Sequence, residues 1–479
     1  MEIAQLVLGG RRTASLEGKT FEVIEPAMDR PFYEVAEADV EDVDNAVQLA
    51  YQTFEQGSWS RLSATARGRI LLKAATLIRE RLEQLAVLEA RNAGKPIRDA
   101  RDEVGLAANV FEYWGGAANK IFGETIPVQD AGLEVTLREP VGVCALITPW
   151  NFPLVIASWK IAPALACGNT VVVKPAQLTP LTTLALADIL MEAGLPEGVI
   201  SVLPGPGAKV GNALVSHPLV AKVSFTGSTE VGSNIMRLCA DNITRVSLEL
   251  GGKAANIVFD DADVQRCINA SVYAVFGNCG QDCCARSRIL VQRSIYEQFT
   301  EQFAARTALL RVGQPLDEQS EVGPLISAGQ RRRAQDYLAL GQREGARVVA
   351  GGAVPPDAGG GYFLQPAVLA GVDNGMRVAQ EEIFGPVVCI IPFESEEEAI
   401  RLANDTPYGL SGSVWTQNLG RALRVAKAVR AGVLSVNSNH SVHTEAPFGG
   451  YKRSGFGREM GMHAAQLYTE VKSIFFSEE

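Results

Sequence analysis

The sequence contains no block of basic residues and no apolar run long enough to span a membrane. Lys and Arg number 44 against 54 Asp and Glu, so the 479-residue chain carries a net charge of −10. An acidic chain without a basic patch argues against nucleic acid or an anionic membrane surface as a partner. The stretch that comes closest to a membrane span, residues 152–173, is interrupted by Lys160, Pro163 and Asn169, so we expect no membrane association.

Histidine is scarce, and the cysteines lack the spacing of a disulfide or metal framework. The eight cysteines are scattered, no secretory signal peptide precedes them, and the four histidines form no cluster with them. We therefore expect reduced thiols in the cytoplasm and no metal site. The cysteines are Cys144, Cys167, Cys239, Cys267, Cys279, Cys283, Cys284 and Cys389, and the histidines are His217, His440, His443 and His463.

Helical and strand-like stretches alternate along most of the chain, which is long enough for two or three domains. Apolar spacing predicts helices over 39–56, 65–91 and 97–120, and residues 134–138 resemble an extended ribbon. From residue 141 onward, strand-like runs alternate with helices, which predicts an α/β fold with doubly wound parallel sheets. The runs are 141–147, 170–173, 199–203, 222–225 and 245–248, followed by 286–291, 387–392 and 433–436 in a second segment of about 256–437.

Two adjacent cysteines, Cys283 and Cys284, follow the turn signal Gly280-Gln281-Asp282. A thiol on such a turn is held on rigid backbone with N–H groups pointing at it, which lowers its pKa and makes it a nucleophile. Taken alone, the pair equally suits a buried structural site, because free cysteine is among the most buried residue types.

Three further stretches place polar side chains on rigid turns. They read ITPWNFP (residues 147–153), VSLELGGK (246–253) and EEIFGP (381–386). Together with the Gly-Gln-x-Cys stretch, and in the same order, these motifs resemble the aldehyde dehydrogenase superfamily. The resemblance covers nearly the whole chain and implies NAD(P)-dependent oxidation of an aldehyde to the carboxylic acid.

The resemblance also implies a division into three parts. Residues 1–122 and 141–248 would form a Rossmann-like dinucleotide-binding domain, and residues 249–448 a second Rossmann-like, catalytic domain. Residues 123–140 and 465–479 would form a small β-ribbon oligomerisation unit. Since an exposed ribbon edge invites pairing with another chain, we expect a homodimer or homotetramer.

The resemblance gives catalytic roles to three residues. Cys283 would attack the aldehyde and carry a thiohemiacetal and then a thioester, with Cys284 and Cys279 as packing residues. Glu249 would be the general base for water and should be partly desolvated, with a raised pKa. The side chain of Asn151 and the backbone N–H of Cys283 would form the oxyanion hole. No histidine is near, so backbone dipoles, the cofactor's positive charge or Glu249 would activate the thiol.

Cofactor contacts are implied for the ends of several strands, although the chain has no regular Gly-x-Gly-x-x-Gly and residues 204–211 depart from its spacing. Gly227 allows close backbone approach, and Ser228 opens a helix whose N-terminus suits a phosphate. Glu382 would hold the nicotinamide ribose, and Phe384 would press on the ring. The whole set is Ile147, Thr148, Pro149, Trp150, Lys174, Gln177, Gly207, Gly211, Phe225, Gly227, Ser228, Val231, Leu250, Glu382 and Phe384.

Gln177 bears on the choice between NAD and NADP. It lies three residues after Lys174, the implied contact of the adenosine ribose. Many NAD-preferring members of the superfamily carry Glu at this position, where a carboxylate bonds the ribose hydroxyls and repels a 2′-phosphate. A neutral amide removes that repulsion. We therefore expect NADP to be accepted and to rival or exceed NAD.

The implied substrate tunnel is mainly apolar and aromatic. It would be lined by Leu106, Val110, Phe152, Trp159, Phe276 and the loop 438–445. That loop carries no Lys or Arg to bind a terminal carboxylate. We expect a small aldehyde with an apolar or aromatic tail rather than a semialdehyde such as succinic semialdehyde.

Three alternatives remain open from the sequence. A coenzyme-A-acylating aldehyde dehydrogenase would pass the thioester to a thiol, whereas Glu249 favours water. A non-redox cysteine hydrolase would use the same thiolate but normally needs a histidine partner. A structural or binding relative would keep the fold without turnover.

Overall fold

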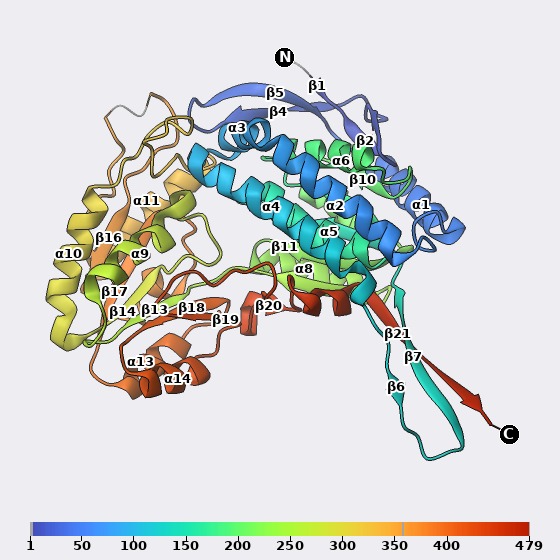
Figure 1. Ribbon diagram of the computed structural model, residues 1–479. Coiled ribbons are helices and arrows are strands. Elements are labelled where there is room, and N and C mark those ends of the chain that lie inside the picture. The colour runs from blue at the N-terminus through green and yellow to red at the C-terminus, as the bar shows by residue number, and fades with distance from the viewer. Residues whose placement is uncertain (1–2, 357–358, 479) are drawn as a thin grey trace.

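The computed structural model describes residues 3–356 and 359–478. Residues 1–2 and 479, which fall in the expected dinucleotide-binding part and ribbon, lie outside the described residues. Two open sheets covered by helices lie beside each other, and a long β-ribbon extends away from them (Figure 1). The α/β fold class predicted from the sequence is confirmed. In the described part of the chain, no helix is both long and apolar enough to cross a membrane.

The first sheet has eight strands, of which the five central ones are parallel. Its edge strands β20, β2 and β3 are antiparallel additions. In spatial order the strands are β20 (Gly455–Phe456), β12 (Arg245–Glu249), β11 (Val220–Thr226), β8 (Val143–Ile147), β9 (Thr170–Lys174), β10 (Ile200–Val202), β2 (Leu6–Leu8) and β3 (Arg11–Thr13).

Helices cover both faces of this sheet because alternate side chains of each strand point to opposite faces. In β8, Cys144 and Leu146 belong to one apolar cluster, and Val143, Ala145 and Ile147 belong to the other. The first cluster contains α2 (Ala64–Glu80), α3 (Leu82–Ala93), α4 (Ile97–Ala117), α5 (Pro153–Ala166) and α6 (Leu181–Ala193), and the second contains α1 (Val40–Gln56), α7 (Asn212–Val215) and α8 (Thr229–Ala240). Every residue of α5 is buried.

The single helix predicted over 65–91 is wrong, because the chain breaks it at Arg81. That residue leaves helical geometry, with φ −104° and ψ 17°, and its N–H bonds back to Leu77 and Ile78. The break lets α2 and α3 each pack against both α4 and α6. No glycine or proline marks it in the sequence.

The second sheet has seven strands, all parallel except the edge strand β15. In spatial order they are β15 (Arg347–Ala350), β16 (Ala367–Ala370), β17 (Val387–Phe393), β14 (Arg288–Gln292), β13 (Ala255–Val258), β18 (Ser411–Trp415) and β19 (Val433–Val436). The accompanying helices are α9 (Val264–Phe276), α10 (Tyr296–Ala308), α11 (Ala328–Arg343), α12 (Arg377–Gln380), α13 (Glu396–Asn404) and α14 (Leu419–Ala428). A separate apolar cluster forms their core.

The ribbon joins segments that are far apart in sequence. β21 (Thr469–Ser477) pairs antiparallel along the whole of β7 (Gly132–Pro140), and β6 (Thr125–Ile126) adds a short third strand. Figure 1 shows the ribbon projecting from the body of the molecule, with the C-terminal end near its tip. The extended ribbon predicted around 134–138 is confirmed.

A small sheet near the N-terminus was not predicted. It consists of β1 (Ile3–Ala4), β5 (Arg30–Ala36) and β4 (Thr20–Glu25), in that order. Pro31 and the charged residues of these strands gave them no regular alternation in the sequence. The strands form because β4 and β5 pair as a hairpin through a turn at Asp29, whose φ is 49°.

Candidate active site

The carboxyl ends of four neighbouring strands lie level along one edge of the first sheet. Ile147 of β8 pairs with Lys174 of β9 and with Phe225 of β11, and Thr226 pairs with Glu249 of β12. In open α/β sheets, ligands bind in the crevice outside these ends. Strand register therefore brings the expected base and several expected cofactor residues to one edge.

Cys283 lies in a turn that follows a distorted helical turn, Gly277–Gly280, in which Asn278 and Cys279 have positive φ of 49° and 57°. The Cys284 N–H donates to Asp282 Oδ1 at 2.8 Å. The loop after Glu249 packs on this turn so closely that a Cβ on Gly252 would lie 2.5 Å from the Cys283 carbonyl oxygen. Because Gly252 has no side chain, the loop at the edge of the first sheet can contact the turn of Cys283, which precedes β14 of the second sheet.

The expectation of a lowered thiol pKa is wrong for this structure. A hydrogen bond with the neighbouring Cys284 thiol, together with burial, raises the pKa of Cys283 well above its usual range, and the nearby Asp282 and Glu382 carboxylates add to this. The sequence showed the turn but not the acids that fold around it. Cys279 is buried as expected of a packing residue, and burial raises its pKa beyond the ordinary thiol range.

Asn151 is buried and bonded to the same turn. Its side-chain Nδ2 donates to the Gln281 carbonyl at 3.0 Å. Its own carbonyl accepts from Asn278 Nδ2 at 2.9 Å and from Lys95 Nζ at 2.9 Å. A primary amide carries two N–H donors, so one remains for a ligand beside Cys283.

Glu249 is fully buried, and neither of its carboxylate oxygens has a hydrogen-bond partner among the described residues. Burial raises the pKa of Glu249 well above its usual range, with a further contribution from the Glu459 carboxylate and an opposing one from Lys160. The raised pKa expected from the sequence is confirmed in direction. A buried acid with free oxygens can accept a proton near neutrality.

Glu459 and Lys160 were not singled out in the sequence. Lys160 Nζ forms an ion pair with Glu459 Oε1 and donates to Ser224 Oγ at 3.0 Å, and Ser224 Oγ donates to the same carboxylate oxygen at 2.9 Å. Lys160 lies in the apolar helix α5, and Glu459 is 299 residues away. A charged residue inside an otherwise apolar helix was the one available signal.

The residues expected to hold the nicotinamide ribose adjoin Glu249. The Glu382 carboxylate accepts from the Gly252 N–H at 2.9 Å, and a Cβ on Gly251 would fall 2.2 Å from that carboxylate. Burial raises the pKa of Glu382. Phe384, with φ 58°, packs edge-to-face on Trp150 at 5.2 Å between ring centroids.

The residues expected on the adenosine side of the cofactor lie along the same edge of the sheet or at the helix that follows it. Burial lowers the pKa of Lys174 to about 8, and its Nζ donates to the Pro175 carbonyl at 3.0 Å. Gly211 lies against the Lys174 side chain, and Gln177 is partly exposed. Ser228 caps α8 by accepting from the Val231 N–H at 3.3 Å.

The remaining expected contacts are also at this edge or close to it. Thr148 and Thr226, which directly follow the paired residues Ile147 of β8 and Phe225 of β11, are buried, and in the described structure neither hydroxyl has a partner. Gly227 adjoins the Phe225 ring, Leu250 is buried, Val231 is half-exposed, and Gly207 begins the wide helical turn Gly207–Gly211. Buried hydroxyls and a buried lysine without a carboxylate partner fit a polar, anionic ligand.

Comparison with known proteins identifies the family to which the chain belongs. The family model described as aldehyde dehydrogenase family matches residues 13–474. The chain is 44% identical to betaine aldehyde dehydrogenase of Bacillus subtilis, over 95% of this chain and 93% of the relative. It is 42% identical to mitochondrial aldehyde dehydrogenase of Homo sapiens, over 98% and 91%. The chain belongs to the aldehyde dehydrogenase family.

Solved structures agree with this membership. PnpE from Pseudomonas sp. WBC-3, crystallised in complex with nicotinamide adenine dinucleotide, is 44% identical, with a TM-score of 0.97 over 99% of this chain and 97% of that one. An aldehyde dehydrogenase from Bacillus cereus is 42% identical, with a TM-score of 0.98 over 100% and 97%. The protein is thus an NAD(P)-dependent oxidoreductase that converts aldehydes to acids, and the acylating and hydrolase alternatives are not favoured.

Most of the apolar residues expected to line the tunnel of this aldehyde dehydrogenase lie on the Cys283 side. Leu106, Val110, Phe152 and Trp159 belong to, or pack against, the cluster that also contacts Cys283. Trp159 packs on Phe448 at 5.2 Å between ring centroids. Phe276 differs, because it is fully buried in the core of the second sheet against Phe303, where its neighbours are core side chains.

One cation reaches the loop 438–445 from outside it. Arg286, which is fully buried, donates to Ser441 Oγ at 2.9 Å, to Ser411 Oγ at 2.6 Å and to the Cys284 carbonyl at 2.6 Å. Reading the loop alone missed this contact, because Arg286 follows the cysteine pair in sequence. The guanidinium ties the loop to the turn of Cys283.

Three potential metal ligands lie together at the turn of Cys283. One ligand atom each of Asp282, Cys283 and Cys284 lies within 4.8 Å of the others. They are consecutive residues, and a structural zinc site normally uses four ligands from at least two chain segments. The expectation of no metal site stays a prediction.

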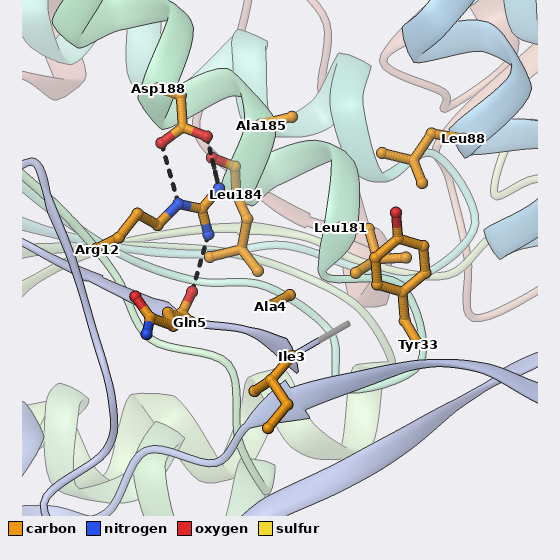
Figure 2. A pocket seen from close by; sticks show the side chains of 10 residues that line it. All are labelled: Ile3, Ala4, Gln5, Arg12, Tyr33, Leu88, Leu181, Leu184, Ala185 and Asp188. Atoms are coloured by element: carbon orange, nitrogen blue, oxygen red, sulfur yellow. Dashed lines mark hydrogen bonds and ion pairs between the residues drawn. The ribbon is translucent and has the colours of Figure 1, made fainter. Parts of the chain in front are cut away.

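One cavity lies away from the candidate active site. It measures about 350 Å³ and is bounded by the N-terminal strands, α3 and α6, with the Arg12–Asp188 ion pair at its side (Figure 2). Leu88, Leu181 and Tyr33 face it, and none of the residues expected for cofactor or catalysis lines it.

Proposed function

We propose that this aldehyde dehydrogenase works through Cys283 as nucleophile, Asn151 as oxyanion donor and Glu249 as general base. The observation that supports this most directly is Glu249: a buried acid with two free oxygens, at the end of a strand whose following loop packs on the turn of Cys283. Water is the expected thioester acceptor because a buried carboxylate with a raised pKa can take its proton.

The steps follow from these positions. The thiol of Cys283 releases its proton to solvent. Its sulfur then forms a bond to the aldehyde carbon as the carbonyl π bond breaks, which places a negative charge on the aldehyde oxygen. The free N–H of Asn151 and the backbone N–H of Cys283 donate to that oxygen. A nicotinamide held beside Glu382 and Phe384 would supply the hydride acceptor for this adduct, and a thioester would then remain on Cys283. Glu249 then takes a proton from water, the resulting hydroxide attacks the thioester carbon, and the C–S bond breaks to release the acid.

We propose that either NAD or NADP serves as cofactor, with NADP accepted. Glu382 and Phe384 would hold the nicotinamide side, and Lys174 with Gln177 the adenosine side. The N-terminus of α8 at Ser228 would face the pyrophosphate. Support for NADP comes from Gln177, a neutral side chain where a carboxylate would repel the 2′-phosphate.

We propose a small aldehyde with an apolar or aromatic tail as substrate, because Cys283 packs against the apolar cluster that contains Val110 and Trp159. The test is a panel of aldehydes assayed with both cofactors, with product analysis. The panel contains aliphatic and aromatic aldehydes, betaine aldehyde and succinic semialdehyde. We expect the free acid, formed fastest from an apolar or aromatic aldehyde. Acyl-CoA as product would overturn the proposal that water accepts the acyl group. The highest kcat/KM with succinic semialdehyde would overturn the proposal of an apolar or aromatic substrate.

We further propose the assembly and setting. A homodimer or homotetramer, formed through the ribbon, would cover apolar side chains that the single chain exposes, among them Leu133, Leu137 and Val471. The cytoplasm suits eight free cysteines. The division into a dinucleotide-binding part, a catalytic part from residue 249 and a ribbon is proposed with the boundaries given above.

A further inference from the structure

Lys95 is a fully buried charge beneath the proposed oxyanion donor. It lies between Gly94 and Pro96 in the turn that joins α3 to α4. Its Nζ donates to the Asn151 carbonyl at 2.9 Å and forms an ion pair with Glu103. A second carboxylate, Glu89, is 3.7 Å away. The ammonium also lies over the Phe152 ring, 4.7 Å from its centroid.

The Asn151 carbonyl accepts two hydrogen bonds, which come from different parts of the chain. Lys95 approaches from the helices of the first unit, and Asn278 approaches from the turn of Cys283. Two donors on one carbonyl fix the peptide plane that follows Asn151. The amide of the Asn151 side chain is in turn bonded to the Gln281 carbonyl at 3.0 Å, so the direction of its second N–H is fixed as well.

The charge of Lys95 is held by the surrounding acids rather than by solvent. Glu89 accepts from the Leu154 N–H at 3.4 Å and from Thr182 Oγ1 at 2.6 Å, which anchors it to α5 and α6. Burial raises the pKa of Glu103 to about 8, against the lowering effect of Lys95. Breaking a buried pair by removing one partner is costly, so this network resists movement.

The Gly94–Pro96 turn packs tightly against the segment of the chain that forms the second sheet and its helices. A Cβ on Gly94, whose φ is 81°, would lie 3.0 Å from the Pro324 side chain, and one on Gly323 would lie 1.9 Å from the Gly94 carbonyl oxygen. The Ile97 N–H donates to the Pro315 carbonyl at 2.8 Å. The position of Lys95 therefore depends on both units at once.

We propose that Lys95 is a positioning residue for the reaction, which holds Asn151 so that its free N–H points at the aldehyde oxygen bonded to Cys283. The inference rests on the proposed role of Asn151. Lys95 touches neither substrate nor cofactor and acts through the Asn151 carbonyl. Because the interaction matters only when the oxygen becomes charged, its loss lowers kcat rather than raising the KM of the cofactor.

The test compares Lys95→Met with Asn151→Ala in the full-length enzyme. Rates are expressed per titrated Cys283 thiol in protein taken from the folded size-exclusion peak, so that misfolded molecules do not count. Lys95→Met is expected to lower kcat about 10- to 100-fold, the size of loss that follows removal of a residue that orients a metal ligand. Asn151→Ala is expected to lose about 10²- to 10³-fold. With the aldehyde deuterated at the reacting carbon, the isotope effect on kcat should increase in both.

A double variant separates positioning from general stability. In the Asn151→Ala background, Lys95→Met should cost little more, because the group that it orients is gone. Glu103→Gln, which keeps Lys95 on the Asn151 carbonyl, is the matched control and should lose far less. If Lys95→Met does not fold, Lys95→Arg replaces it, since a planar fork cannot reproduce a single ammonium contact.

Each result has one meaning. An unchanged kcat per titrated thiol in Lys95→Met, alongside a loss in Asn151→Ala, would overturn the positioning role alone. Full additivity of the two losses would do the same. An unchanged rate in Asn151→Ala would instead remove the proposed role of Asn151 and, with it, this inference.

Discussion

At the scale of single residues, the burial of Glu249 has a consequence for stability as well as for its proposed role in catalysis. Burial raises its pKa in the folded protein above the unfolded value of about 4.5. The folded state therefore holds this proton more tightly, and stability from Glu249 is full below the unfolded pKa and is lost as pH rises through the folded one. The contribution of Glu249 to stability therefore falls as pH rises above its unfolded pKa.

Replacing Glu249 by Gln tests this sign. The two proteins should have similar Tm at acid pH, and Glu249→Gln should become progressively more stable than the parent as pH rises. Thermal melts across the pH range, in one buffer series at constant ionic strength, give the difference directly. A constant difference in Tm between the two proteins at every pH would show that Glu249 is not desolvated in the fold.

Gln177 gives a second prediction at this scale. Gln177→Glu places a carboxylate beside the proposed ribose site and should lower kcat/KM for NADP about tenfold or more, through charge repulsion with the 2′-phosphate. The value for NAD should change little. Leu178→Glu, at the exposed neighbour, controls for a general change of charge. An equal effect on both cofactors would contradict the assignment.

The sequence could point to Cys283, Glu249 and Asn151 because each stands in a contiguous motif. It could not reveal Lys95, Glu459 or Arg286, whose contacts with the site come from distant segments. It also misjudged the Cys283 thiol. Backbone N–H groups can be inferred from a turn, but the Asp282 and Glu382 carboxylates that raise its pKa gather only on folding.

At the scale of elements, the ribbon of β7 and β21 exposes apolar side chains that a single chain leaves uncovered. Val471→Glu places a charge on it and should shift the protein toward smaller species, because burying an unpaired charge in an interface is costly. Size-exclusion chromatography with light scattering measures this. Leu419→Glu, at another exposed apolar position, on α14, should leave the mass unchanged. An unchanged mass in both would place the interface elsewhere.

Element prediction succeeded where periodicity was regular and failed where pairing was decided at a distance. The parallel strands β8, β9 and β11 were recognisable as apolar runs. The hairpin of β4 and β5 was not, because its strands are half-exposed and contain a proline. The break at Arg81 has no local signal, and packing of two helices against the same neighbours produces it.

At the scale of the whole molecule, the proposed site lies where two separately packed units meet. The cofactor edge belongs to the first sheet, whereas Cys283 belongs to a turn of the second. This arrangement predicts that occupancy of one changes the reactivity of the other. The raised pKa of Cys283 should fall when a positively charged nicotinamide lies beside it.

Alkylation of the thiol measures this coupling. The rate with iodoacetamide at Cys283, followed by peptide mass spectrometry, should be several-fold higher with oxidised than with reduced cofactor bound, since only the oxidised ring is positively charged. Cys284 gives an internal comparison in the same digest. Equal rates would mean that the cofactor's charge does not activate the thiol.

The central claim is that a covalent thioester forms on Cys283 and is released by water activated by Glu249. It is tested most directly by mixing the Glu249→Gln enzyme with aldehyde and oxidised cofactor, quenching, and mapping the mass of the modified peptide. We expect an acyl group on Cys283, with one reduced cofactor formed per modified thiol. An acyl group on Cys284, or reduced cofactor and free acid released at the parent rate without any adduct, would contradict it.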